Sequence, residues 1–151
     1  MTGMDQVPAD SARIVLVPPG GGVPVVRLNG ETTVLVVDAQ HTNGANALRR
    51  NSAPPRFDAV PLHVHRSAEE AFLVTDGELA VYADGRWQTA PSGSFVLIPR
   101  GTEHALGNAS PATVSWITLI SPGADAGWVQ AEHELIIGPA PPLPEGPPGS
   151  R

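Results

Sequence analysis

The stretch that decides the fold runs from Pro61 to Gly85 and reads PLHVHRSAEEAFLVTDGELAVYADG. Two Asp-Gly pairs, Asp76-Gly77 and Asp84-Gly85, each lie between runs in which apolar and polar residues alternate. Asp-Gly favours the two-residue turn of a β-hairpin, because both turn positions need a positive φ. The stretch therefore predicts antiparallel strands joined by tight turns.

The first of these turns sets a predicted strand register, with Phe72 opposite Val81 and Glu70 opposite Ala83. Successive side chains of a strand point to opposite faces. One face then consists of Glu70, Phe72, Val74, Leu79 and Val81. Because this face is mostly apolar, we expect it to point into the core. Glu70 would project into the interior, and its neighbour Glu69 would face outward.

The second turn predicts a cross-strand pair of aromatic side chains, Tyr82 and Trp87. Such pairs stabilise a sheet or an interface. We favour this role over a platform for a ligand.

Short strand candidates and turn residues alternate along most of the chain, with little helical periodicity. The 16 glycines and 17 prolines are spread out, which is typical of many turns. This pattern predicts an all-β sandwich or barrel. A short helical turn is a further candidate at Ala124–Gln130. The predicted strands are Ile14–Val17, Val23–Leu28, Thr32–Ala39, Asn46–Arg50, Leu62–His65, Glu70–Thr75, Glu78–Ala83, Trp87–Thr89, Ser94–Ile98, His104–Asn108 and Thr113–Ile120.

We expect a single domain between flexible ends. A chain of 151 residues can build one core but hardly two. Residues 1–12 are polar and are predicted to be flexible. Residues 13–137 should form the barrel. Residues 138–151 are rich in proline and glycine, which form neither ladder nor helix, so a disordered tail is predicted.

Composition excludes several kinds of chemistry. The net charge of −6 would repel a phosphate backbone, so nucleic acid is not an expected partner. All nine basic residues are arginines, and cysteine is absent. Schiff-base lysines, thiolate nucleophiles and disulfides are therefore excluded. A metal ion would have to be held by imidazole and carboxylate groups.

The sequence also gives an expectation about location. The first ten residues have neither the basic segment nor the apolar segment of a signal peptide. Apolar runs such as Val34–Val37 are far too short to span a bilayer. We therefore expect a soluble, cytoplasmic protein that does not enter a membrane.

Three histidines and one glutamate form the candidate site. His63 and His65 would point about 200° apart on a helix, but they project from the same face of a strand. Glu70 follows five residues later and is expected to face inward, while His104 begins a new strand after a turn. A buried carboxylate needs a partner. That partner is a cation held with the imidazoles or, alternatively, Arg66.

These residues stand in a pattern that resembles the two motifs of the cupin superfamily. The first is His63-Val64-His65, four residues, Glu70, six residues and Gly77. The second is Gly93, five residues, Pro99-Arg100-Gly101, two residues, His104, three residues and Asn108. One position departs from the family, since Phe57 stands where the first motif usually begins with glycine.

The resemblance implies a jelly-roll β-barrel, often a homodimer, with one divalent transition metal ion inside. Its ligands would be His63, His65, Glu70 and His104. Imidazole and carboxylate ligands are compatible with Fe, Ni, Mn, Co, Cu or Zn. The partner of such a site is a small-molecule substrate.

Five further residues are candidates for the substrate pocket. Arg49 and Arg50 end a predicted strand, and one of the two is a candidate for binding a substrate anion, for which we choose Arg50. A surface salt bridge is the alternative. Asn108 shares strand parity with His104 but can also bond a turn. Trp116 is a candidate pocket wall, or part of the core. Phe72 and Val81 lie on the same predicted face as Glu70.

The resemblance leaves three functions open. In the first, the protein is similar to quercetin-dioxygenase-like cupins and oxidises an enol or phenol, with Glu70 as both ligand and base. In the second, a non-redox metal centre serves a cyclase, isomerase or dehydratase of natural-product (polyketide) biosynthesis. In the third, the barrel binds a sugar or another small molecule without catalysis.

Overall fold

The computed structural model describes residues 14–26, 30–123 and 134–145, and these form eleven strands without any helix. No helix capable of crossing a membrane occurs in this part of the chain. The strands are β1 (Val23–Val26), β2 (Thr32–Val37), β3 (Ala47–Ala53), β4 (Leu62–His65), β5 (Glu69–Asp76), β6 (Glu78–Ala83), β7 (Arg86–Pro91), β8 (Phe95–Ile98), β9 (His104–Gly107), β10 (Val114–Ser121) and β11 (Glu134–Gly138).

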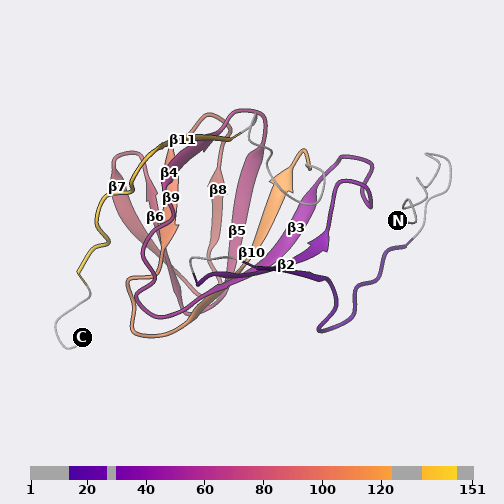
Figure 1. Cartoon of the computed structure of the whole chain (residues 1–151), viewed down its shortest axis with the longest axis horizontal. Helices are drawn as coiled ribbons and strands as arrows, with labels where there is room; N and C mark the ends of the chain where they lie inside the picture. The colour runs from indigo at the N-terminus through magenta and orange to yellow at the C-terminus, as the bar shows by residue number, and fades with distance from the viewer. Residues whose placement is uncertain (1–13, 27–29, 124–133, 146–151) are drawn as a thin grey trace.

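The strands form two antiparallel sheets that face each other (Figure 1). The larger sheet has the order β1-β2-β3-β10-β5-β8, and the smaller has the order β11-β4-β9-β6-β7. Neighbours in each sheet come from distant parts of the chain, as in the pairing of β3 with β10. This architecture confirms the predicted all-β jelly-roll fold.

The predicted hairpin at Asp76-Gly77 is wrong. Strand β5 pairs with β10 and β8, whereas β6 pairs with β7 and β9 in the other sheet. The chain therefore crosses between the sheets at Gly77, which has a φ of 73°. A Cβ on Gly77 would lie 2.5 Å from the carbonyl oxygen of Thr113. The close approach of this backbone explains why glycine occupies the crossing.

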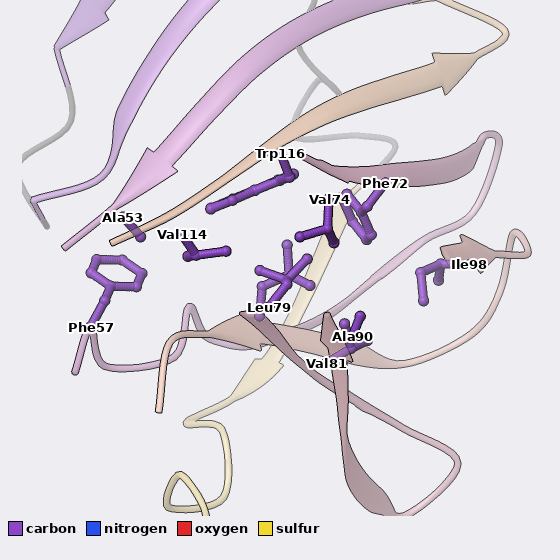
Figure 2. Close-up of a cluster of buried hydrophobic side chains, with 11 residues drawn as sticks. Ala53, Phe57, Phe72, Val74, Leu79, Val81, Ala90, Ile98, Val114 and Trp116 are labelled. Atoms are coloured by element: carbon purple, nitrogen blue, oxygen red, sulfur yellow. The ribbon is translucent and has the colours of Figure 1, made fainter. Parts of the chain in front are cut away.

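The inward face predicted across that turn is nevertheless buried. Phe72 and Leu79 are fully buried, and Glu70 is 6% exposed. Alternation within each strand sets the face, so it holds although the two strands line opposite sheets. Each large apolar side chain buried there stabilises the fold by roughly 1.5–3 kcal/mol. Figure 2 shows this core, formed by Ala53, Phe57, Phe72, Val74, Leu79, Val81, Ala90, Ile98, Leu106, Val114 and Trp116.

The second turn forms as predicted. Asp84 and Gly85 both have positive φ, at 54° and 78°. Tyr82 lies opposite Trp87, and their ring centroids are 5.4 Å apart in an edge-on arrangement. The aromatic pair thus joins β6 to β7.

The ends of the chain differ from expectation. The predicted strand at Ile14–Val17 does not form, because this apolar segment has no ladder partner within the described residues. Strand β11 was not predicted, yet it pairs with β4 beside the histidines. Residues 1–12 and the predicted helical turn at Ala124–Gln130 lie outside the described residues.

The proline-rich tail is irregular over residues 139–145, but part of it contacts the barrel. The side chain of Leu143 occupies the space that a Cβ at Gly107 would take, 2.7 Å from that position. Gly107 of β9 therefore leaves space for the tail. The proline content of the tail did not predict this contact.

Gly77→Ala should destabilise the protein more than Gly85→Ala. Both glycines have positive φ, so each substitution costs about 1 kcal/mol in backbone strain. Only at Gly77 does the new methyl group meet backbone, since nothing lies within 4 Å of a Cβ at Gly85. We expect a total loss of roughly 3 kcal/mol or more for Gly77→Ala, measured by urea unfolding. Equal losses would refute the crossing described above.

Candidate metal centre

The four predicted ligands converge in the interior of the barrel. His63 and His65 come from β4, Glu70 from the start of β5 and His104 from the start of β9. His63 lies directly opposite His104 in the ladder between β4 and β9. All four side chains are buried, and their ligand atoms lie within 4.8 Å of one another. The structure thus brings together residues that are up to 41 positions apart, from His63 to His104.

The imidazole rings surround one oxygen of the carboxylate. Glu70 Oε2 lies 2.7 Å from His65 Nε2 and 3.2 Å from His104 Nε2. The His63 ring centroid is 4.3 Å from that of His104 and 4.9 Å from that of His65. The cluster therefore points its polar atoms toward a common centre.

The outer nitrogens of two rings fix their tautomers. His63 Nδ1 is 2.7 Å from the carbonyl oxygen of Pro61, and His104 Nδ1 is 2.9 Å from that of Thr102. A carbonyl oxygen only accepts, so each Nδ1 carries the hydrogen and donates it. In the neutral imidazoles Nε2 then presents a lone pair to the interior.

This arrangement fits a metal ion. A lone pair on His104 Nε2 faces a carboxylate oxygen of Glu70, and two acceptors at 3.2 Å need a proton or cation between them. Both ring nitrogens of His65 are buried without an aligned hydrogen bond among the described residues. Three neutral imidazoles and one carboxylate form a donor set that binds divalent transition metals. The cluster can therefore hold such an ion.

The surroundings of Glu70 and His63 favour an ionised carboxylate and a neutral imidazole, the protonation states of metal ligands. Burial raises the pKa of the Glu70 carboxyl. In the metal-free protein a proton on the inner nitrogens of His104 and His65 takes the place of the ion, and the hydrogen bonds that these rings then donate, together with the guanidinium of Arg49, outweigh burial and hold that pKa below its usual range. Burial, reinforced by His104, lowers the pKa of His63. Glu70 is thus ionised and His63 neutral at physiological pH, as metal ligation requires.

The contact of Arg49 with Glu70 was not predicted from the sequence. Side chains of β3 alternate between buried and half-buried, and Arg49 is on the buried side at 8% exposure. Its Nη2 lies 3.5 Å from Glu70 Oε1. Arg66, the alternative partner for Glu70, is exposed. The alternation could have identified Arg49, because Ala47 and Ala53 share its parity and are apolar.

The structure places the candidate pocket residue Arg50 away from the four ligands. Arg50 has the opposite parity in β3, so its side chain leaves the barrel and donates a hydrogen bond to the carbonyl oxygen of Gly21.

Asn108 forms hydrogen bonds within the loops. This is the alternative that the sequence offered to a position lining the site. Its Nδ2 donates to the carbonyl oxygens of Pro54 and Ala112, and its Oδ1 accepts from Ser110. These bonds hold together the loops that precede β4 and β10. Among the residues that the structure describes, no contact between Asn108 and the four ligands is found.

The remaining pocket candidates belong to the core. Trp116 is 4% exposed and lies between Val74 of β5 and Asn51 of β3 in the sheet register. Phe72 and Val81 are buried in the same apolar cluster (Figure 2). Phe72 follows Glu70 by two residues on the same face, so the core begins directly beside the candidate metal centre.

Comparison with known proteins agrees with this geometry. The family described as cupin domain matches residues 52–120, which include all four ligands. A stretch of 48 residues is 46% identical to quercetin 2,3-dioxygenase of Bacillus subtilis, and it covers 32% of this chain and 14% of that enzyme. Residues 52–120 therefore form a cupin domain, and the fold agrees with this match.

Solved structures share the fold at low sequence identity. A predicted oxalate decarboxylase from Thermotoga maritima has a TM-score of 0.63 and 18% identity, covering 72% of this chain and 99% of its own. KdgF from a Halomonas species has a TM-score of 0.59 and 17% identity, covering 68% and 90%. Streptomyces PAC13 with uridine has a TM-score of 0.64 and 11% identity, covering 85% and 93%.

His104→Ala should abolish metal retention. It removes a fully buried ligand that faces both His63 and Glu70. Metal content would be measured by elemental analysis of protein purified without added metal. His41→Ala is the matched control, because His41 pairs with Asp38 in a loop outside the cluster and should not alter the metal content. Full metal occupancy in the His104 variant would refute the ligand set.

The metal-free protein should lose stability as the pH falls. The folded pKa of Glu70 is below its ordinary 4.5, so its contribution is complete above pH 4.5 and is lost below it. The folded pKa of His63 is below 6.5, so the unfolded chain binds that proton first and stability begins to fall near pH 6.5.

Urea unfolding of chelator-treated protein at a series of pH values would measure this dependence. Glu70→Gln should flatten the part below pH 4.5. Asp84→Asn, in the exposed turn after β6, is the control and should leave it unchanged. Identical slopes in the wild type and the Glu70 variant would contradict the assigned environment.

Proposed function

We propose that this protein is a metal-dependent, dioxygenase-type oxidoreductase that acts on a small organic molecule with an enol or phenol group. The observation that carries the proposal is the convergence of three imidazoles on one oxygen of a buried, ionised carboxylate. The local similarity to a quercetin 2,3-dioxygenase supports the redox assignment, although it spans only 14% of that enzyme.

The ion would be held by His63, His65, Glu70 and His104. When bound, such a metal acidifies a coordinated hydroxyl group and brings substrate and dioxygen together. The ligand types suit Fe, Ni, Mn, Co, Cu and Zn. The hydrogen bonds from His63 and His104 to backbone carbonyls keep both rings oriented toward the centre.

Glu70 is the proposed base. Its oxygens have different surroundings, since Oε2 faces the imidazoles and Oε1 faces Arg49. A carboxylate with a lowered pKa is a weak base, so it accepts a proton only from a hydroxyl that has been acidified. An enol or phenol meets that requirement better than an alcohol. The neighbouring side chain of Phe72 excludes water from the same face.

Oxygen consumption tests this proposal. Protein loaded separately with each candidate metal would be supplied with a flavonol in an oxygen electrode. We expect oxygen uptake that matches flavonol loss for a redox-active metal. Glu70→Gln should lower the rate by about 100-fold, in the range for a lost general base. Glu69→Gln is the matched control, because Glu69 bonds Arg100 at the exposed end of β5 and should keep full activity.

Two outcomes would contradict the redox assignment. One is the absence of substrate-dependent oxygen uptake with every metal tested. The other is turnover of a polyketone substrate by the zinc-loaded protein without oxygen, which would identify a non-redox cyclase, isomerase or dehydratase.

A further inference from the structure

We propose that a C-terminal strap, residues 134–145, keeps the histidine strand β4 closed on the barrel and thereby slows the exchange of the metal ion. The strap consists of β11 and the proline-rich segment that follows it. Leu143 is the positioning residue that fastens it. The inference rests on the candidate metal centre and adds to it the route by which an ion enters and leaves.

Strand β4, which carries His63 and His65, is attached more extensively to the strap than to the rest of its sheet. Its ladder with β11 runs along the whole strand. On the other edge, the described ladder with β9 contains the single pair His63 and His104. The amide of Gly101 adds one bond there, to the carbonyl oxygen of His65 at 2.7 Å. Loss of the β11 ladder would therefore leave β4 as a weakly attached edge strand.

Side-chain burial by itself does little to hold β11 in place. Leu135, Ile136 and Ile137 are 42%, 56% and 44% exposed, so the strand buries little apolar surface. Segments with few buried apolar contacts open locally at a low cost in free energy. The strap would therefore open readily unless a further contact fastened its end.

Leu143 makes that contact on the outer face of the smaller sheet. In the ladder between β9 and β6, Leu106 pairs with Val81 of the core, so the next residue, Gly107, points outward. A Cβ at Gly107 would lie 2.7 Å from Leu143 Cδ2, so the leucine occupies the space that glycine leaves. Leu143 is half-buried, whereas the prolines on either side of it are exposed. The leucine is thus the anchor of this segment.

Prolines connect the anchor to β11, which ends at Gly138. Pro139, Pro141 and Pro142 lie between Gly138 and Leu143. Proline fixes φ, so the connection loses few conformations when the leucine docks and has little slack once it is docked. Docking of Leu143 therefore restrains the end of β11, and through it the ladder with β4.

Opening of the strap would remove half of the ligand set in one local movement. His63 and His65 both come from β4, whereas Glu70 and His104 come from β5 and β9. If β4 moves away, the two remaining ligands stay in strands that the strap does not pair with. An ion held by two ligands dissociates faster than one held by four. Opening of the strap is therefore a route for metal release that leaves the rest of the barrel folded.

Release of cobalt into a chelator tests the strap without any turnover. The full chain loaded with Co²⁺ would be mixed with excess EDTA, and the visible absorption of the bound cobalt would be followed. We expect Leu143→Ala to release cobalt about tenfold faster than the wild type, because the anchor is lost. Leu143→Met keeps the side-chain volume and should release it like the wild type. Val96→Ala is the matched control, since it shortens a partly buried side chain in β8 of the other sheet.

A substitution on the other side of the contact gives a second test. Gly107→Ala places a methyl group against Leu143 and should also accelerate release. In the double variant Gly107→Ala/Leu143→Ala the methyl group enters the vacated space, so the acceleration should be well below the product of the two single effects. An acceleration equal to that product would contradict the contact.

Hydrogen exchange of the metal-free protein separates the strap from the metal centre. Leu143→Ala should accelerate exchange of the amides in β4 and β11 and leave those of β8 unchanged. Unchanged exchange in β4, or equal acceleration in every strand, would overturn the strap. Unchanged cobalt release from Leu143→Ala would overturn its control of metal exchange. A wild type that retains no cobalt would refute the metal centre instead, and hydrogen exchange would still decide whether the strap holds β4.

Discussion

The structure depends on one set of buried contacts, in which the carboxylate of Glu70 lies between the imidazoles of His65 and His104 and the guanidinium of Arg49. An ionised carboxylate with 6% exposure is unstable in an apolar interior unless charged or hydrogen-bonding partners surround it. Those partners come from β3, β4 and β9, in both sheets. The interior therefore closes around Glu70 only when the two sheets are correctly packed, so the fold and the candidate site form together.

The crossing at Gly77 explains how an apolar core and a polar site share one interior. Since β5 and β6 lie in opposite sheets, Phe72 and Val74 pack across the barrel against Leu79 and Val81 (Figure 2). The same alternation that buries these side chains places Glu70 at the end of the row. A rigid apolar core thus supports the carboxylate from one side, which keeps its position fixed relative to the histidines.

Local pattern predicted the site better than it predicted the strand pairing. Period-two alternation gave the inward direction of Glu70, His63 and His65 correctly, because it depends only on the pleat of each strand. The pairing of β5 with β6 was wrong, since Asp-Gly favours a positive φ but does not specify whether the chain returns to its own sheet. Arg50 was chosen as the pocket candidate, although Ala47 and Ala53 share the parity of Arg49 and mark that arginine as the inward-facing one.

The sequence by itself determined the all-β class, the four candidate ligands and the exclusion of cysteine and lysine chemistry, because residue type and alternation are local properties. Tertiary structure alone decided which strands became neighbours, and with them that β11 covers the histidine strand and that Arg49 reaches Glu70 from β3. These contacts join residues 21 or more positions apart, as Arg49 and Glu70 illustrate. Their free energy arises only when burial removes the water that otherwise separates them.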